Sequence, residues 1–76
     1  MEVGQVAIVR FPHDAVPVPA VAKIRALRGD QALVSKRRGL TWGKPRWVPS
    51  NDIARQATDR ERVVGMPIDP IPPRAA

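Results

Sequence analysis

The strongest chemical signal in this sequence is a cluster of basic side chains that could bind phosphate. Between Lys23 and Arg46 the chain holds eight basic residues against a single acid, Asp30, whereas the other 52 residues hold five basic and six acidic ones. The run Lys36-Arg37-Arg38 lies at the centre of this window. An arginine offers phosphate a fork of donors and a lysine a point charge. Such concentrated positive charge attracts phosphate backbones or an acidic protein surface, and it speeds encounter.

The two tryptophans lie at the end of the same basic window. With Phe11 they are the only aromatic residues of the chain. Trp47 alternates with Val48 in a predicted strand, so we expect it to occupy a core position. Trp42 lies in a predicted loop, and two interpretations stay open. It stacks on a base or anchors a protein contact, or it folds back to cover one open end of the domain.

The candidate binding residues are the basic side chains of this window together with Trp42. They are Lys23, Arg25, Lys36, Arg37, Arg38, Trp42, Lys44 and Arg46. We expect the run from Lys36 to Arg38 to form a glycine-punctuated loop that straddles phosphates, with Lys23 and Arg25 on the outward face of the neighbouring strand. The alternative for this run is a solvated hairpin tip.

Other chemistry has little support in the residue types. The chain has no cysteine and one histidine, His13, so thiolate metal sites and disulfides are excluded and a zinc site lacks ligands. Neither Ser35 nor Ser50 lies in a nucleophile-elbow motif, and no glycine-rich phosphate loop is present. We therefore expect a protein that is not an enzyme and has no cofactor, metal or small-molecule substrate. Without an apolar run of membrane-spanning length or a signal-peptide pattern, we expect it to be cytoplasmic, with no membrane partner.

The elements that must position these residues are predicted to be mostly strands. Segments rich in β-branched residues or alternating in polarity are expected to be strands over residues 4–11, 20–27, 32–35, 46–48 and 54–57. A helix over Val18–Leu27 is the competing interpretation, because Ala, Lys, Arg and Leu are good helix formers. The strand is favoured, since Arg28-Gly29-Asp30-Gln31 then forms a hairpin turn.

Two helical pieces and a proline-rich tail follow. Residues 49–53 are expected to form one helical turn capped by Ser50. Thr58 and Glu61 match a capping box that opens a short helix, which Gly65 ends. The prolines of residues 66–76 predict a disordered tail or one extended along a partner, and the Pro-x-x-Pro spacing also permits a polyproline ligand. The predicted organisation is therefore a barrel over residues 1–57, a short helix or turn over 58–65, and an extended tail over 66–76.

The order of strand, proline-containing loop, two hairpins, helical turn and final strand resembles an SH3-like small β-barrel. Tudor, KOW and retroviral-integrase C-terminal domains are of this type. The resemblance lies in residues 4–9, 21–24, 31–34, 47–49 and 53. It implies an all-β fold of about five short strands, with a short C-terminal helix and a disordered proline-rich tail. Family members bind DNA, RNA, methylated tails or proteins. Readers of methylated side chains use a cage of several aromatic residues, and this chain has only three and no tyrosine.

Two functions are compatible with these observations. The first is a non-enzymatic nucleic-acid-binding module of low sequence specificity, because no recognition helix or zinc finger is evident. The alternative is a small regulatory adaptor of the phage or mobile-element type. Its basic face and tail would dock on an acidic surface of a host protein such as the transcription machinery. A nucleic-acid-binding module would retard bare DNA or RNA in a gel, and an adaptor would not. The sequence does not distinguish DNA from RNA as the ligand, and it does not give the oligomeric state.

Overall fold

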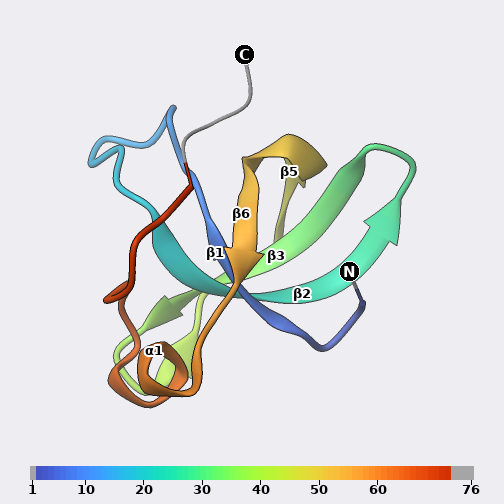
Figure 1. The fold of residues 1–76 in the computed structure, drawn as a ribbon. Coiled ribbons are helices and arrows are strands. Elements are labelled where there is room, and N and C mark those ends of the chain that lie inside the picture. Colours follow the sequence, from blue (N-terminus) through green and yellow to red (C-terminus); the bar gives the residue numbers. More distant parts are fainter. Residues whose placement is uncertain (1, 73–76) are drawn as a thin grey trace.

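The computed structural model describes residues 2–72, which form an antiparallel sheet of six strands and one short helix (Figure 1). The elements are β1 (Val6–Val9), β2 (Ala20–Arg28), β3 (Gln31–Arg38), β4 (Thr41–Trp42), β5 (Arg46–Pro49), a 3-10 turn (Ser50–Asp52), β6 (Ile53–Gln56) and α1 (Asp59–Val64). The all-β prediction is confirmed. Residues 20–28 form a strand and not the competing helix, because they pair with β1 on one side and β3 on the other and bury Val21, Ala22 and Ile24.

The strands follow the order β6-β1-β2-β3, and the free edge of β3 pairs with both β5 and β4. The first half of β3 faces β5, with Leu33 opposite Trp47, and its end faces β4, with Arg37 opposite Trp42. A register shift between Ile24 and Ala26 marks a bulge in the long β2 strand, and bulges bend a sheet. Figure 1 shows the resulting curved β2–β3 ribbon. The return of β6 to β1 after the 3-10 turn follows the expected element order, while membership of the SH3-like family stays a prediction.

The main core lies on one face of the curved sheet. It is built from the residues Ala7, Val9, Phe11, Ala22, Ile24, Ala32, Val34 and Val48, all buried. Successive strand residues point to opposite faces, so Val6 and Ile8 on β1 leave this core and enter a second cluster. That cluster contains buried Ile8, Val21 and Ala57, against which Val6, Trp42, Ala54 and Ile71 pack. The central strands are therefore apolar on both faces.

Helix α1 begins with the predicted capping box. The Glu61 amide donates to Thr58 Oγ1 at 3.3 Å, and the Thr58 amide donates to a Glu61 carboxylate oxygen at 2.9 Å. Gly65 ends the helix with φ 85°, a left-handed conformation that glycine adopts without strain. The predicted cap at Ser50 is wrong, because Pro49 takes the N-cap position of the 3-10 turn and no side chain caps it. Within the described chain no helix is long and apolar enough to cross a membrane.

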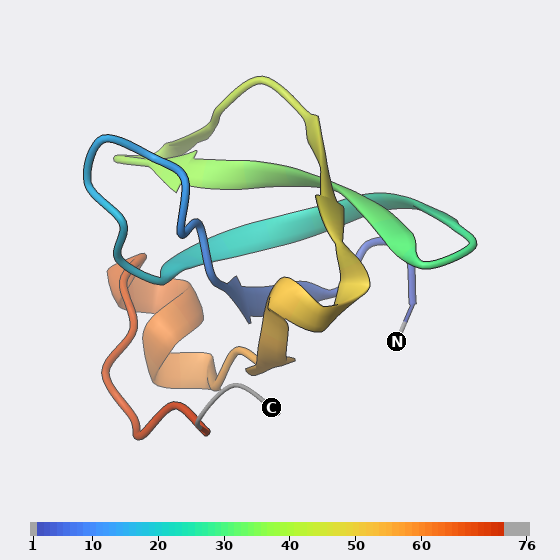
Figure 2. The same cartoon turned by 90° about the horizontal axis from the view of Figure 1, so that it is seen from above.

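The proline-rich tail has no helix or strand up to residue 72, as predicted, and its described part lies against the rest of the domain. The amides of Ile68 and Asp69 donate to Glu61, and Ile71 packs against the second cluster. Arg10 donates to the carbonyl of Pro72. Prolines lack amide donors, so the tail docks through its carbonyls and through the amides of Ile68 and Asp69. Figure 2 shows α1 and the tail together along one side of the sheet; residues 73–76 of the predicted tail lie outside the described residues.

Candidate nucleic-acid interface

The basic run Lys36-Arg37-Arg38 is the end of strand β3 and not the predicted loop. It continues the pairing of β3 with β2 and β4, with Lys36 opposite Ala22 and Arg38 opposite Thr41. Because side chains alternate along a strand, Arg37 points to one face of the β3–β4 ribbon while Lys36 and Arg38 point to the other. The run therefore cannot straddle phosphates as a single loop, and the structure divides the basic residues into two groups.

The first group surrounds a cavity of about 370 Å³ that we call the basic hollow. Its charged lining residues are Lys36, Arg38, Lys44, Arg46 and Asp14. Strands β3 and β5 carry three of the four cations, and the 43–45 connection carries Lys44. Four cations thus converge on one cavity against a single carboxylate. These four belong to the residue set predicted from the sequence.

Asp14 is shared between two of these cations. Arg46 Nη2 lies 2.7 Å from Asp14 Oδ2, and Lys36 Nζ lies 3.4 Å from the same oxygen. The hydrogen bond from Arg46, followed by that from Lys36, lowers the pKa of Asp14, so the carboxylate is ionised at neutral pH. The same two cations lie 4.3 Å and 4.9 Å from the centroid of the Phe11 ring, a favourable cation–π arrangement. Arg38 and Lys44 have no ion pair within residues 2–72.

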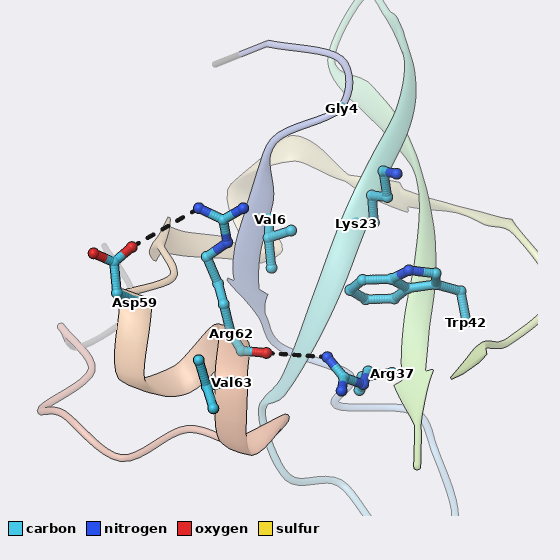
Figure 3. Close-up of a pocket in the computed structure, with 8 residues that line it drawn as sticks. All are labelled: Gly4, Val6, Lys23, Arg37, Trp42, Asp59, Arg62 and Val63. Atoms are coloured by element: carbon cyan, nitrogen blue, oxygen red, sulfur yellow. Dashed lines mark hydrogen bonds and ion pairs between the residues drawn. The ribbon is translucent and has the colours of Figure 1, made fainter. Parts of the chain in front are cut away.

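The second group surrounds a cavity of about 470 Å³ that we call the tryptophan hollow. Its lining residues are Gly4, Val6, Lys23, Arg37, Trp42, Asp59, Arg62 and Val63. Figure 3 shows the Trp42 indole pointing into the hollow towards Val6, with Lys23 above it, Arg37 below it and Arg62 across from it. Strands β1, β2, β3 and β4 and helix α1 all contribute to this wall, so an aromatic ring and three cations face one space.

Arg37 is the most constrained cation of the tryptophan hollow. Its Nε donates to the carbonyl of Gly39 at 2.6 Å, and its Nη1 donates to the carbonyl of Arg62 at 3.1 Å. Its guanidinium carbon lies 5.5 Å from the Trp42 ring centroid. Arg62 makes only a long, exposed ion pair with Asp59 at 3.9 Å. Lys23 has no ion pair among the described residues.

The prediction that Trp47 occupies a core position is wrong, and the structure favours one of the two interpretations of Trp42. Trp47 is 42% exposed, and Arg28 stacks over its ring at 5.3 Å from the centroid. Trp42 is half-buried and packs against the second cluster. The reason is strand alternation: Val48 points into the main core, so its neighbour Trp47 must point outward. The packing of Trp42 agrees with the alternative in which it covers one end of the domain.

The last of the predicted site residues, Arg25, lies outside both hollows. It is exposed on β2, and its Nε donates to Ser35 Oγ at 3.1 Å. Sequence reasoning instead missed Arg62, which joins the tryptophan hollow from α1. No local signal could have found it, because its position depends on how α1 docks against the sheet.

A buried ion pair that sequence reasoning also missed fixes that docking. Arg55 of β6 donates to both carboxylate oxygens of the fully buried Glu61, at 2.6 Å and 2.8 Å. Thr58 donates twice more to this carboxylate, and the Ile68 and Asp69 amides complete its shell. The bonds from Arg55, then those from Thr58 and Ile68, hold the pKa of Glu61 far below its usual range although burial raises it.

The same hydrogen bonds, which Arg55 donates to Glu61, raise the pKa of Arg55. Arg55 also donates to the carbonyls of Asp69 and Pro70, so the pair ties the tail to the sheet. With every carboxylate oxygen engaged, this pair is a structural lock and not a reactive group. We call Arg55, Glu61 and the tail residues bound to them the buried lock.

No known family model matches the chain, and neither a curated protein nor a solved structure matches it significantly. Within residues 2–72 no group of three or more His, Asp or Glu side chains is placed to hold a metal ion. The function must therefore be argued from the chemistry of the two hollows.

Proposed function

We propose that this domain binds nucleic acid through its phosphate backbone, at the basic hollow. The observation that supports the proposal is the convergence of four cations on one cavity that contains a single carboxylate. Arg38 and Lys44 are exposed, and a phosphate can reach them without breaking an ion pair recorded for residues 2–72. Arg46 and Lys36 are held in place by Asp14 and Phe11. Such pre-ordering reduces the entropy lost on binding.

Binding of this kind depends strongly on salt and weakly on sequence. Each phosphate contact contributes a slope of about −0.9 on duplex DNA, or about −0.7 on a single strand, in a plot of log affinity against log salt. Four contacts would thus give a slope of roughly −3. Phosphate contacts position a protein without reading bases, and α1, with six residues, offers little surface for the groove. We therefore expect low sequence specificity.

A charge-matched pair of variants tests the site. Arg38→Ser with Lys44→Ser removes two cations of the basic hollow, and Arg28→Ser with Arg60→Ser removes two exposed cations elsewhere. Fluorescence anisotropy with a labelled oligonucleotide at several salt concentrations should show at least about a tenfold loss for the first variant and a slope smaller by about 1.5. The second variant should keep most of the affinity and most of the salt dependence, because it changes only the net charge.

Two results would contradict the proposal. Equal losses in the two double variants would mean that net charge, and not the hollow, attracts the nucleic acid. Failure of the unmodified protein to bind DNA or RNA at low salt would overturn nucleic-acid binding altogether. If the same protein then bound an acidic protein surface, the adaptor function would replace it. The exposed apolar side chains of α1, such as Val63 at 81% exposure, would be the next place to probe.

A further inference from the structure

We infer that the tryptophan hollow holds an unpaired base next to its phosphates, so that the preferred ligand is single-stranded nucleic acid. The inference rests on the proposed function and narrows its ligand class. It assigns a role to a cavity that is separate from the basic hollow and lies on the other face of the β3–β4 ribbon.

The lining of the tryptophan hollow complements a nucleotide, with three cations against the single carboxylate of Asp59. The Trp42 indole and the side chains of Val6 and Val63 form apolar wall, and Gly4 contributes no side chain to fill the space. The cations Lys23, Arg37 and Arg62 lie around the indole in Figure 3. Every base has a flat apolar face and every nucleotide a phosphate close to it. Aromatic side chains in a positively charged groove are the usual means by which proteins hold unpaired strands.

Trp42 is held in position before any ligand arrives. Its backbone pairs with Arg37 across the β3–β4 ribbon, and its side chain packs against the cluster of Ile8, Val21 and Ala57. The Arg37 guanidinium lies over the ring. A base that enters the hollow therefore meets an ordered aromatic surface, and little side-chain entropy is lost on binding.

The placement of the two hollows favours a flexible strand over a stiff one. Arg37 faces the tryptophan hollow, whereas its neighbours Lys36 and Arg38 face the basic hollow on the other side of the ribbon. Duplex DNA is stiff over about 150 base pairs, so a duplex laid against one face reaches one hollow. A single strand can pass over the Gly39–Leu40 turn, where Leu40 is 94% exposed, and contact both.

The two tryptophans of the chain provide a direct measurement. In Trp47→Phe the remaining emission comes from Trp42, and in the matched variant Trp42→Phe it comes from Trp47. A thymidine oligonucleotide of about 16 nucleotides should quench Trp42 emission in the first variant and leave Trp47 emission in the second unchanged. Inorganic polyphosphate, which has no bases, should bind without the quench. The matching duplex should bind at least about tenfold more weakly than the single strand, since it forgoes base stacking.

A second pair of variants does not depend on replacing a tryptophan. Val63 lines the tryptophan hollow and is 81% exposed, whereas its neighbour Val64, 54% exposed, does not line it. Val63→Glu places a negative charge at the hollow, so it should weaken oligonucleotide binding by about tenfold. Val64→Glu should weaken it much less, and both variants should keep the melting temperature of the parent.

The outcomes separate the inference from the proposed function. Oligonucleotide binding without a change in Trp42 emission, or equal affinity for single strand and duplex, would overturn the inference and leave the basic hollow as a phosphate site. Equal effects of the two glutamate variants would do the same. If neither single strand nor duplex binds at low salt, the proposed function fails and the inference fails with it.

Discussion

Asp14 and Glu61 are two carboxylates that each bind an arginine, in two regions of opposite character. Glu61 is fully buried and receives six donors from Arg55, Thr58, Ile68 and Asp69. Asp14 keeps 23% of its side chain exposed and is shared by Arg46 and Lys36 in a cavity where cations outnumber it. The same pairing of arginine with carboxylate therefore neutralises the charge in the region around Glu61, whereas the region around Asp14 keeps an excess of positive charge.

The difference lies in what surrounds each pair. In the buried lock one guanidinium meets one carboxylate and both carboxylate oxygens are engaged, so the pair is electrically complete and leaves no group free for a ligand. In the basic hollow the single carboxylate orders two cations without neutralising the group, so the region can still attract an anion. An ion pair found in a structure therefore says little about function until the surrounding charges are counted.

The largest expected effect comes from replacing each of the two carboxylates in turn by its amide. Glu61→Gln should lower the free energy of unfolding by about 3–5 kcal/mol, because it leaves the largely buried Arg55 guanidinium without its counter-charge. That is a large part of the stability of a small domain. Asp14→Asn should leave the melting temperature nearly unchanged. Urea denaturation of both variants measures the contrast.

A double variant makes this first test robust. Arg55→Met with Glu61→Leu removes both charges together and should be more stable than Glu61→Gln, as replacement of buried ion pairs by apolar residues often is. If Asp14→Asn proved as damaging as Glu61→Gln, the division into a structural and a functional carboxylate would be wrong.

Loss of the tail should be the next largest effect. Deleting residues 67–76 removes the Ile68 and Asp69 donors of Glu61 and two carbonyl acceptors of Arg55. We expect a loss of about 2–3 kcal/mol, since hydrogen bonds to charged groups are worth roughly 1.5–3 kcal/mol each and water replaces part of them. The melting temperature should fall by roughly 10 °C or more. As a finer control, Ile71→Ala should destabilise more than Ile68→Ala, because Ile71 packs against the second cluster and Ile68 is 41% exposed.

The two tryptophans should also differ in their effect on stability. Trp42→Ala removes a half-buried ring from the second cluster and should cost about 2 kcal/mol, less than the 3–5 kcal/mol typical of a fully buried large aromatic. Trp47→Ala removes an exposed ring and its contact with Arg28, and should cost about 0.5–1 kcal/mol. If thermal melts showed that Trp47→Ala is the more destabilising change, Trp47 would be the core residue that the sequence predicts.

Acid should weaken the buried lock first. The pKa of Glu61 in the folded protein is far below that of an unfolded glutamate, about 4.3. The stability that this group contributes is therefore present above pH 5 and is lost progressively as the pH falls below 4. Denaturation curves between pH 7 and pH 2 should show this decline. The double variant Arg55→Met with Glu61→Leu should show a weaker one, and an identical decline would assign it to other carboxylates.

The smallest effect should appear in the basic hollow. Asp14→Asn removes its one negative charge and releases Arg46 and Lys36 from their shared partner. Affinity for a labelled oligonucleotide should rise by about threefold, with a slightly steeper salt dependence. Because the pKa of Asp14 is lowered, its protonation should not alter binding between pH 6 and pH 8. A decrease in affinity would show that Asp14 positions the cations more than it neutralises them.

Local patterns in the sequence predict most of the elements. The apolar alternation of residues 20–27, the Gly29–Asp30 turn and the Thr58–Glu61 capping box are all confirmed, because each depends on neighbours in the chain. The end of β3 was missed because three successive cations resemble a loop in composition. Pairing with β2 and β4 overrides that preference.

The rest depends on contacts between distant residues. Which of two tryptophans points inward is set by strand register, and a shift of one residue exchanges the faces. Arg55 and Glu61 are six residues apart on different elements, and their partners Ile68 and Asp69 come from the tail. Arg62 enters the tryptophan hollow only because that lock holds α1 in place. The sequence therefore predicted which residue types form the candidate site. It did not predict that these residues divide between two hollows.

Arg37 connects the tryptophan hollow to helix α1, which the buried lock holds in place. Its guanidinium donates to the backbone of Arg62 in the last turn of α1 and lies against Gly65, where a β-carbon would meet it at 3.4 Å. If nucleic acid binds as proposed, a phosphate that draws this guanidinium away leaves the helix carbonyl without its donor, and ligand binding is then thermodynamically linked to helix docking. Linkage is reciprocal. If a bound nucleic-acid strand weakens the docking of the end of α1, then any change that weakens this docking must raise the affinity for the nucleic acid. The position that ends the helix is thereby also a point at which the ligand affinity of the domain can be tuned.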